Sequence, residues 1–331
     1  MKYLSLVFVL TVTLFFSACA SKEVFEPENV SDDWEYYGSS DFTIENIASN
    51  SALVEDNKIL VNGEVVDVVI DENERLLGSS DGWVLSSTID GNLTLRAVTD
   101  STVMEHFDLK RTISTASVKD DILAVLFTNN KMALYSIGSK ELLLKEQGDA
   151  PVVINSKVIA PYFKDNLVIF STLDGKVVLI NIDTKKKLRT AIVSSEDNFN
   201  NIIYFDFVDN KIIASTGHKI LSLAKKELRV KYDIRNVIDD GKNIYLSTKQ
   251  GEIVSLTPDL QLNKKVKFPF AHFLGMIMGV NNLYVLEKEG YIIELSKDLL
   301  EYKIYEVDVE DGYIFIDDKV FYIDDEYILV E

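Results

Sequence analysis

Short apolar runs recur along the chain from about residue 34 to its end, and clusters of Asp, Asn and Gly separate them. The runs are rich in Val, Ile, Leu, Tyr and Phe, and almost none of them has the 3.6-residue periodicity of an amphipathic helix. Such runs are typical of many short β-strands. The pattern therefore predicts an all-β fold.

Four segments share the clearest pattern, which is a strand, a tight turn with glycine and a returning strand: 83–95, 167–180, 243–256 and 284–295. Glycine suits these turns because it adopts a positive φ without steric cost. Weaker copies of the same pattern lie at 126–135, 213–221 and 320–329. Each segment predicts one antiparallel hairpin.

The predicted turns recur at intervals of 34 to 45 residues. A period near 40 residues with four short strands per unit is typical of β-propeller blades. We therefore expect a single β-propeller over residues 34–331. We count seven four-stranded antiparallel blades, with eight as the alternative, because the region 53–77 either belongs to the first blade or forms a degenerate additional one. A two-sheet sandwich is less consistent with so regular a period.

Closure of the ring requires a strand from outside the last repeat. The final apolar strand, 326–330, leaves no residues for a fourth strand in its blade. We expect an N-terminal strand, 41–47, to complete that blade. Deletion of residues 34–47 should then lower the stability, because it reopens the last seam between blades.

The N-terminal segment has a different pattern, with Lys2, an apolar run over 4–16 and then Ser17-Ala18-Cys19. A membrane-spanning helix needs about 20 apolar residues, so this run is too short to be one. A basic start, an apolar core and small residues before a cleavage site indicate an export signal. Small residues directly before the only cysteine resemble the lipobox of bacterial lipoproteins, although Phe16 stands where Leu is usual.

This resemblance implies a lipoprotein signal peptide over residues 1–18 and a mature chain that begins with lipidated Cys19, carrying fatty acyl chains such as palmitate. An ordinary secretory signal with an incidental cysteine is the alternative. Residues 19–33 are polar and lack periodicity, which predicts a flexible tether. We therefore expect a soluble domain that acyl chains hold to a membrane.

The net charge of −19 makes contact with phosphate backbones and anionic lipid unfavourable for the chain as a whole. Nucleic acid is therefore not an expected partner. Hydrophobic residues make up 47% of the chain, which is ample for a large core. With Cys19 acylated, no disulfide can form, so packing and backbone pairing must provide the stability.

One predicted blade carries a family resemblance. Residues 178–188 resemble the blade motif of PQQ-like repeat propellers: Thr184 and Leu188 match it, whereas Lys185 replaces the usual Gly and Arg189 lies near the usual Trp. A lipobox before such a propeller resembles the BamB family, lipoproteins of the outer-membrane β-barrel assembly machinery. The resemblance implies a non-enzymatic scaffold on the periplasmic side of the outer membrane of a Gram-negative bacterium. It also implies the barrel-assembly subunit, and unfolded outer-membrane proteins, as partners.

Propellers also host enzymes, so an active site is the alternative to a scaffold. Quinoprotein dehydrogenases of similar architecture bind PQQ and Ca²⁺, often beside a vicinal disulfide and a stacking Trp. This chain has no second cysteine, and its only tryptophans are Trp34 and Trp83. We therefore expect no cofactor. A quinoprotein-like or small-ligand-binding periplasmic propeller remains the alternative function, and a surface adhesion module is a third.

The titratable residues suggest no active site. His106, His218 and His272 lie far apart, and none has metal-ligand spacing. Paired acids can bind Ca²⁺ or act as general acid and base, but here they end predicted strands, where Asp bonds the turn backbone: 120–121, 239–240, 317–318 and 324–325. The sequence predicts no catalytic, cofactor-binding or metal-binding residue, and lipidation only at Cys19.

Two stretches depart from the blade rhythm, 194–201 and 268–276. Aromatic residues in an exposed loop would suit a protein interface. For the second stretch, the apolar density of residues 273–278 favours an inner strand near the ring axis over an exposed loop.

Overall fold

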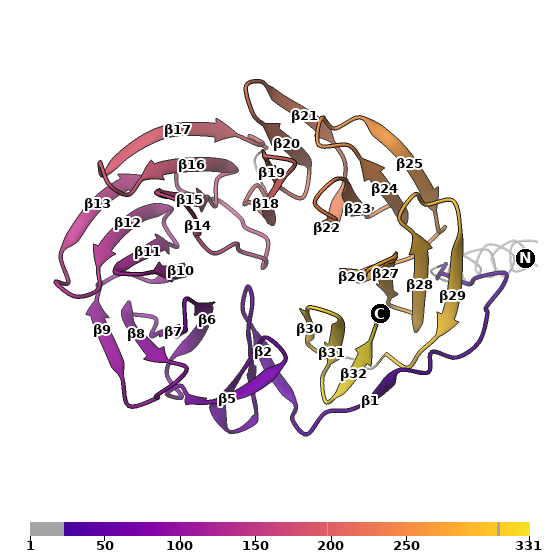
Figure 1. Cartoon of the computed structure of the whole chain (residues 1–331), viewed down its shortest axis with the longest axis horizontal. Helices are drawn as coiled ribbons and strands as arrows, with labels where there is room; N and C mark the ends of the chain where they lie inside the picture. Colours follow the sequence, from indigo (N-terminus) through magenta and orange to yellow (C-terminus); the bar gives the residue numbers. More distant parts are fainter. Residues whose placement is uncertain (1–22, 197, 310–311) are drawn as a thin grey trace, which may run out of the picture.

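The computed structural model describes residues 23–196, 198–309 and 312–331. Within these ranges, strands β1 to β32 form eight sheets of four strands, and the sheets stand around a central axis as the blades of a propeller (Figure 1). The one helical element in the described ranges is a short 3-10 turn, Glu55–Asn57. The predicted all-β propeller is confirmed, and it has eight blades, the alternative to the preferred count of seven.

Seven blades take four consecutive strands, ordered from the ring axis outwards (Figure 1). Blades 1 to 4 are β2 (Ile44–Ile47), β3 (Ala52–Val54), β4 (Lys58–Val61) and β5 (Glu64–Val69); β6 (Arg75–Ser80), β7 (Trp83–Ser87), β8 (Asn92–Ala97) and β9 (Met104–Asp108); β10 (Ile113–Lys119), β11 (Ile122–Phe127), β12 (Lys131–Ser136) and β13 (Leu142–Gln147); and β14 (Tyr162–Lys164), β15 (Leu167–Ser171), β16 (Lys176–Asn181) and β17 (Lys186–Ile192).

The remaining blades follow the same order, except that the last one takes its outermost strand from the N-terminal part of the chain. Blades 5 to 8 are β18 (Tyr204–Val208), β19 (Lys211–Ser215), β20 (Lys219–Leu223) and β21 (Glu227–Lys231); β22 (Ile234–Asp239), β23 (Ile244–Thr248), β24 (Glu252–Leu256) and β25 (Leu262–Lys267); β26 (Phe273–Met278), β27 (Asn282–Glu287), β28 (Tyr291–Ser296) and β29 (Tyr302–Glu306); and β30 (Ile314–Asp317), β31 (Val320–Ile323), β32 (Glu326–Leu329) and β1 (Tyr37–Ser39).

The ring closes through an N-terminal strand, as predicted, but the closing strand is β1 and not residues 41–47. In β1, Gly38 lies opposite Tyr327 of β32. Glycine permits this approach, because a Cβ there would lie 3.0 Å from the Tyr327 Oη. Residues 44–47 instead form β2, the innermost strand of blade 1, because Ile44 is buried between blades 1 and 8.

Blade 1 accounts for the ambiguous region 53–77. Strands β3, β4 and β5 of blade 1 lie in it, and its last three residues begin β6 of blade 2. The β4–β5 turn has Asn62 and Gly63 at φ values of 50° and 76°, the conformation that suits a two-residue hairpin turn. This hairpin completes the blade that the preferred count of seven left out.

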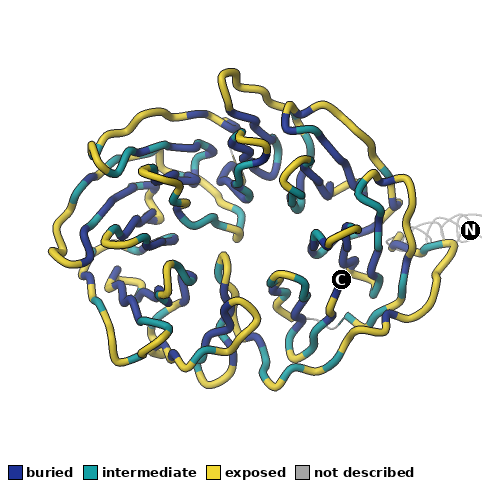
Figure 2. The backbone as a smooth tube through the Cα atoms, viewed as in Figure 1, coloured by how far each residue is buried: buried dark blue, intermediate teal, exposed yellow. Residues whose placement is uncertain are grey.

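The core consists of eight apolar clusters, one at each interface between neighbouring blades. Between blades 3 and 4, for example, Leu126 and Leu134 pack in one cluster with Phe170 and Ile180. Buried positions consequently follow the middle strands of every blade, while the outer strands are largely exposed (Figure 2). Burial of one such side chain contributes about 1.5–3 kcal/mol, so the blades stabilise one another face to face.

The predicted hairpin glycines have a second role besides their turn conformation. Gly91 and Gly251 adopt φ values of 88° and 75°. A Cβ on either residue would lie 2.2 Å from a backbone oxygen, that of Arg111 or Phe268 respectively. The glycines therefore let the turn approach the neighbouring backbone closely.

Candidate protein-binding surfaces

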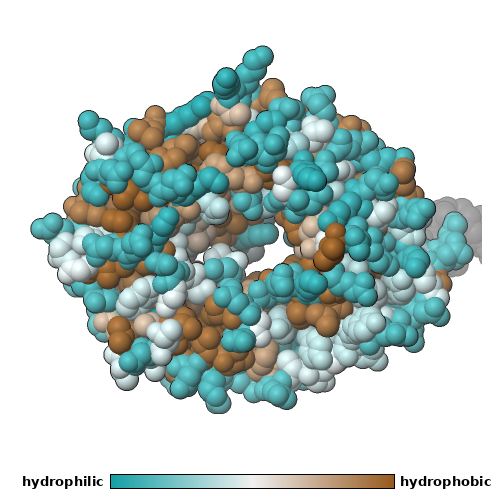
Figure 3. Space-filling model, in the orientation of Figure 1, coloured by the Kyte–Doolittle hydropathy of each residue, from teal (hydrophilic) through white to brown (hydrophobic). Residues whose placement is uncertain are grey.

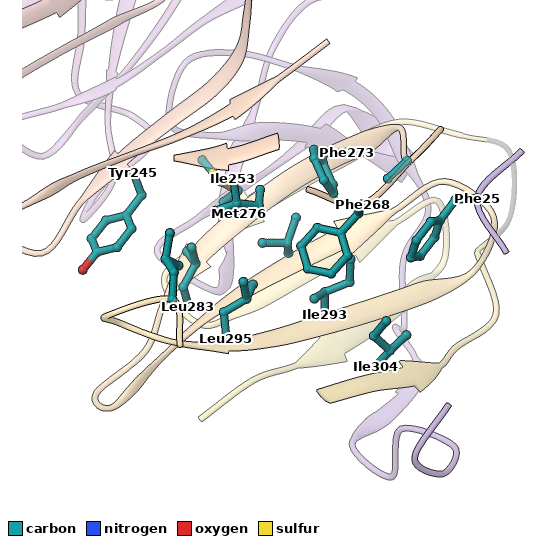
Figure 4. Packing of buried hydrophobic residues seen from close by; sticks show 13 residues of the cluster. Phe25, Tyr245, Ile253, Phe268, Phe273, Met276, Leu283, Ile293, Leu295 and Ile304 are labelled. Carbon is teal, nitrogen blue, oxygen red and sulfur yellow. The ribbon is translucent and has the colours of Figure 1, made fainter. Parts of the chain in front are cut away.

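Residues 23–34, here called the N-terminal strap, lie along blade 7 at the rim of the ring. Cys19, the predicted lipidation site, and the predicted signal peptide lie outside the described residues. Within the strap, Phe25 is 4% exposed and makes edge-to-face contacts with Phe268 and Tyr291, at ring-centroid distances of 6.1 and 5.6 Å. Figure 4 shows Phe25 at the outer end of the apolar cluster between blades 6 and 7.

The strap also pairs with the outermost strand of blade 7. The Ser31 amide donates to the Ile304 carbonyl at 2.8 Å, and the Trp34 amide donates to the Glu306 carbonyl at 2.8 Å. A parallel bridge joins Asp33 to Glu306. The described part of the segment predicted as a tether therefore differs from a flexible chain, because β29 offers it an open edge and Phe25 finds an aromatic pocket.

Trp34 ends the strap as a wedge between blades 7 and 8. Its ring contacts Tyr284 and Tyr305 at centroid distances of 5.9 and 5.0 Å, and its Nε1 donates to the Leu329 carbonyl at 3.0 Å. Only 7% of Trp34 is exposed. The indole is therefore committed to packing and is not free to stack on a ligand.

A groove of about 900 Å³, here called the strap groove, lies between part of the strap and the rim. Its lining includes Glu23 and Glu26 of the strap, together with Lys267, Phe270 and Tyr302 of blades 6 and 7. Phe270 is 58% exposed, whereas the neighbouring Phe268 is buried. The stretch 268–276 thus divides into a loop with one exposed aromatic ring and β26, which confirms the inner strand predicted over 273–278.

A second groove, of about 670 Å³, follows the seam between blades 1 and 8. We call it the seam groove. Phe42, Val54 and Val65 line it from the side of blade 1, and Tyr327 and Leu329 line it from the side of blade 8. Val65 and Leu329 are 40% and 41% exposed. The groove thus presents apolar side chains to solvent at the point where the ring closes.

The outer strand of blade 1 has an available edge. Strand β5 pairs with β4 on one side, and no strand within the described residues covers its other side. Val65 and Val69 are exposed on this strand. Free backbone groups beside an apolar groove can accept an additional strand from a partner.

Basic residues concentrate on the outer strands of blades 4, 5 and 6, here called the basic arc (β17, β21 and β25). These three strands contain one acidic residue, Glu227, and eight exposed basic ones: Lys186, Lys187, Arg189, Arg229, Lys231, Lys264, Lys265 and Lys267. The other five outer strands, β1, β5, β9, β13 and β29, together contain two lysines and six acidic residues. The rim of this acidic protein is therefore polarised.

Ion pairs neutralise only part of the basic arc. Glu227 lies within 2.6 Å of both Arg189 and Arg229, and these pairs hold the pKa of Glu227 below its usual value. Lys186, Lys231, Lys264 and Lys267 form no ion pair within the described residues. The net charge of the whole chain gives no indication of this arc, although the sequence does contain a run of three lysines at 185–187.

The stretch 194–201, predicted as a possible exposed loop, is exposed at its described middle residues, whereas Ser194, Asn200 and Asn201 at its ends are buried. Asn201 is fully buried and its Nδ2 donates to the carbonyls of Asn155 and Lys157 at 3.3 and 2.7 Å. Its Oδ1 accepts from the Asn155 amide at 2.6 Å. Asn201 at the end of the stretch therefore fixes the long connection before β14, and Phe199, which is 48% exposed, is the aromatic residue of the exposed part.

The three histidines lie on separate elements. His106 is in β9, where its Nδ1 lies 3.3 Å from the Thr94 Oγ1. The His272 Nε2 lies 2.7 Å from the Arg235 Nη1. His218 lies in a turn, as predicted, and its amide donates to the Thr216 Oγ1. Within the described residues, no group of three or more His, Cys, Asp or Glu side chains is arranged to hold a metal ion.

Side chains of three of the four acid pairs bond the backbone of turns, as predicted, whereas at 324–325, among the described residues, only backbone groups form hydrogen bonds. The Asp121 Oδ1 accepts from the Gly138 amide at 2.7 Å, and hydrogen bonds from Ser136 and this amide lower the Asp121 pKa. The Asp240 Oδ1 accepts from the Asn243 amide at 2.6 Å. The Asp317 Oδ2 accepts from the Gly63 amide at 2.6 Å, which joins blade 8 to blade 1.

Sequence reasoning missed one buried charge cluster in blade 2. Arg96, which directly follows the predicted segment 83–95, lies 2.8 Å from Glu74, and both side chains are 5% exposed. Ser86 and Thr94 also donate to the Glu74 carboxylate at 2.8 Å. Burial favours a raised pKa for Glu74, but the hydrogen bonds from Thr94, Ser86 and Arg96 outweigh it and the pKa lies below the usual value. The cluster is structural, because its groups satisfy one another.

No protein-family model matches the chain. Two relatives of known name are similar to it, the plasminogen-binding protein PgbB of Helicobacter pylori strain J99 and that of strain 26695. They are 35% and 34% identical over 217 residues. The alignment covers 63% of this chain but 40% of each relative, so the similarity spans less than half of their length.

Solved propellers share the fold at low sequence identity. BamB from Moraxella catarrhalis superposes with a TM-score of 0.69 at 11% identity, over 89% of this chain and 98% of that one. The C-terminal WD40 domain of Sif2 gives a TM-score of 0.64 at 8% identity, and the designed protein Ika8 gives 0.61 at 15% identity, each over 90% of this chain and 99% of the other. The chain thus has the BamB-like propeller fold.

Within the described residues, no helix is long and apolar enough to cross a membrane.

Proposed function

We propose that this protein is a non-enzymatic scaffold lipoprotein of the bacterial envelope, which assists the assembly and insertion of outer-membrane β-barrel proteins by binding other proteins. The observation that carries the proposal is the match of the whole ring to BamB, which covers 98% of that chain. A lipobox-like Cys19 before such a ring supports attachment on the periplasmic side of the outer membrane. The partners are the barrel-assembly subunit and unfolded outer-membrane proteins.

The seam groove and the free edge of β5 are the surface we assign to this binding. The groove offers exposed apolar side chains, and β5 offers unpaired backbone groups beside them. An extended segment of a partner protein can satisfy both, because strand addition supplies backbone hydrogen bonds and alternate side chains enter the groove. Affinity then depends on a few apolar contacts such as Val65.

Binding of plasminogen is a second candidate function. The observation that favours it is the 35% identity to a protein named for plasminogen binding. It would make the chain a surface adhesion module, which uses the same kind of rigid ring to hold a different protein. The matched region is 40% of that relative, so transfer of the activity requires its own test.

Affinity purification from gently solubilised envelopes, with identification of the recovered partners, tests both functions. We expect the barrel-assembly subunit to be recovered with the unmodified protein, and about tenfold less of it with Val65→Asp, because a charge at this groove cannot be buried. Ile89→Asp is the matched control, since Ile89 is 75% exposed in a turn of blade 2. Capture of plasminogen without the barrel-assembly subunit would replace the first function by the second, and a copurifying small molecule without either would contradict both.

A further inference from the structure

Towards the N-terminus, the strap leaves the ring beside the basic arc. Glu23, the first described residue, lines the same groove as Lys267, the last residue of β25, and Phe270. Figure 1 shows this part of the chain at the rim next to β25 and β29. The basic arc therefore begins where the strap leaves the ring.

The chain between Glu23 and Cys19 is short. Four residue steps span at most about 14 Å even when fully extended. In the proposed function, on which this inference rests, Cys19 carries the lipid anchor. Glu23 and the adjoining corner of the ring then stay within about 14 Å of the bilayer surface. The strap cannot supply more length without undocking Phe25 from its aromatic pocket, because Phe25 is 4% exposed there.

We propose that the basic arc lies against the anionic headgroups of the membrane that holds the anchor, so that the ring stands on its edge with β25 nearest the lipidated end. Eight basic residues and one acidic residue on three neighbouring strands give this side of the rim the charge that an anionic surface attracts. The opposite side of the rim, with acidic residues on β5 and β9, turns away from that surface.

Apolar side chains on the same strands suit the headgroup region as well. Leu188 of β17 is 59% exposed between Lys187 and Arg189, and Leu262, the first residue of β25, is 55% exposed. Phe270 is exposed at the loop tip that follows β25, with a positive φ of 65°. Glu23 and Glu26 on the strap oppose the attraction locally. Lys186, Lys231 and Lys264, which form no ion pair in the described part of the chain, do not line the strap groove, and this favours contact by the whole arc and not by that groove alone.

The orientation of the lipidated protein on vesicles tests this inference. Single fluorophores are attached through Leu188→Cys in the arc or Met104→Cys in β9, which is 44% exposed on the acidic part of the rim, and energy transfer to a headgroup dye is measured. On vesicles of phosphatidylcholine with phosphatidylglycerol, we expect clearly stronger transfer from position 188. The difference should disappear on pure phosphatidylcholine and at high salt, because salt shortens the screening length to a few Å.

Charge-reversal variants distinguish an effect of the basic arc from an effect of the total charge of the protein. We expect Lys186→Glu with Lys231→Glu and Lys264→Glu to abolish the difference between the two positions, since each Lys near an anionic surface supplies roughly a fivefold preference. The matched control reverses three lysines elsewhere, Lys145→Glu with Lys249→Glu and Lys288→Glu, and should keep the difference.

Equal transfer from both positions, or transfer that does not depend on lipid charge, would overturn the inference. If the arc variant keeps its orientation but loses a crosslinked protein, the arc is a protein-binding surface and the membrane inference is wrong. Failure of the unmodified protein to float with either kind of vesicle would remove the anchor, and the inference with it. Partner recovery by affinity purification is independent of this readout, so a failure of the scaffold function is distinguished from a failure of the membrane contact.

Discussion

The Arg96–Glu74 pair is the residue-scale feature that departs most from the apolar pattern of the blades. Both side chains are 5% exposed, so removal of the cation leaves an uncompensated buried carboxylate. We expect Arg96→Met to destabilise the protein by about 3–5 kcal/mol, measured by denaturant unfolding. The double variant with Glu74→Met should recover much of this loss. Similar losses in the single and double variants would contradict the account.

Asp206 gives a pH-dependent prediction. Burial, followed by the negative charge of Asp239, raises its pKa in the folded state. Folding therefore favours the protonated form of Asp206. Its contribution to stability is fully present below the pKa of the unfolded state, about 3.9, and is lost as the pH rises through the higher pKa of the folded state. Asp206→Asn keeps an acceptor for the Phe207 amide, which donates to the Asp206 Oδ1 at 2.6 Å.

We therefore expect the Asn variant to unfold at a higher temperature than the unmodified protein at neutral pH, with no gain near pH 4. The measurement is thermal unfolding of both proteins across this range. Asp209→Asn is a control on an exposed turn. A gain that does not vary with pH would show that the substitution acts through packing and not through ionisation.

At the scale of elements, the strap depends on one aromatic side chain. We expect Phe25→Ala to release the strap from blade 7, because the pocket formed with Phe268 and Tyr291 is lost and truncation of a buried Phe costs about 3–5 kcal/mol. Limited proteolysis should then cut within residues 23–33, while the propeller stays intact. Val24→Ala, at a position 38% exposed, should leave the strap protected. Equal protection of both variants would contradict the docking.

The closing strand gives the second element-scale prediction. Deletion of residues 23–39 removes β1 and Trp34 and exposes the edge of β32. We expect a loss of at least about 3–5 kcal/mol, the value for removal of one buried Trp side chain, together with a tendency to associate through the open edge. Unchanged thermal unfolding, or a protein that stays monomeric and fully stable, would show that the ring does not need this seam.

The sequence predicted the repeating elements well because each middle strand is an apolar run and several hairpins carry a glycine. It was less informative about blade 1, where β3 has three residues and a 3-10 turn interrupts the pattern. It was also uninformative about β1, whose three residues include Gly38 and carry no recognisable period. The docking of Phe25 depends on Phe268 and Tyr291, more than 240 residues away, so no local pattern could reveal it.

At the scale of the whole molecule, distribution of charge matters more than its total. The net charge of −19 predicts unfavourable contact with anionic lipid for the chain as a whole, yet blades 4 to 6 carry a basic rim. The lysine runs were visible in the sequence, but their gathering on one side requires knowing that the last strand of each blade is outermost. Fold and ring closure thus follow from local patterns, whereas the candidate surfaces follow only from the assembled ring.

The central claim is that the ring works by holding other proteins in the envelope. Its most direct test is crosslinking in intact cells, with a photoreactive residue placed at Val65 in the seam groove. We predict a crosslink to the barrel-assembly subunit that is absent when the photoreactive residue is placed at Ile89. Reproducible absence of that crosslink, together with a tightly bound small molecule in the purified protein, would contradict the account.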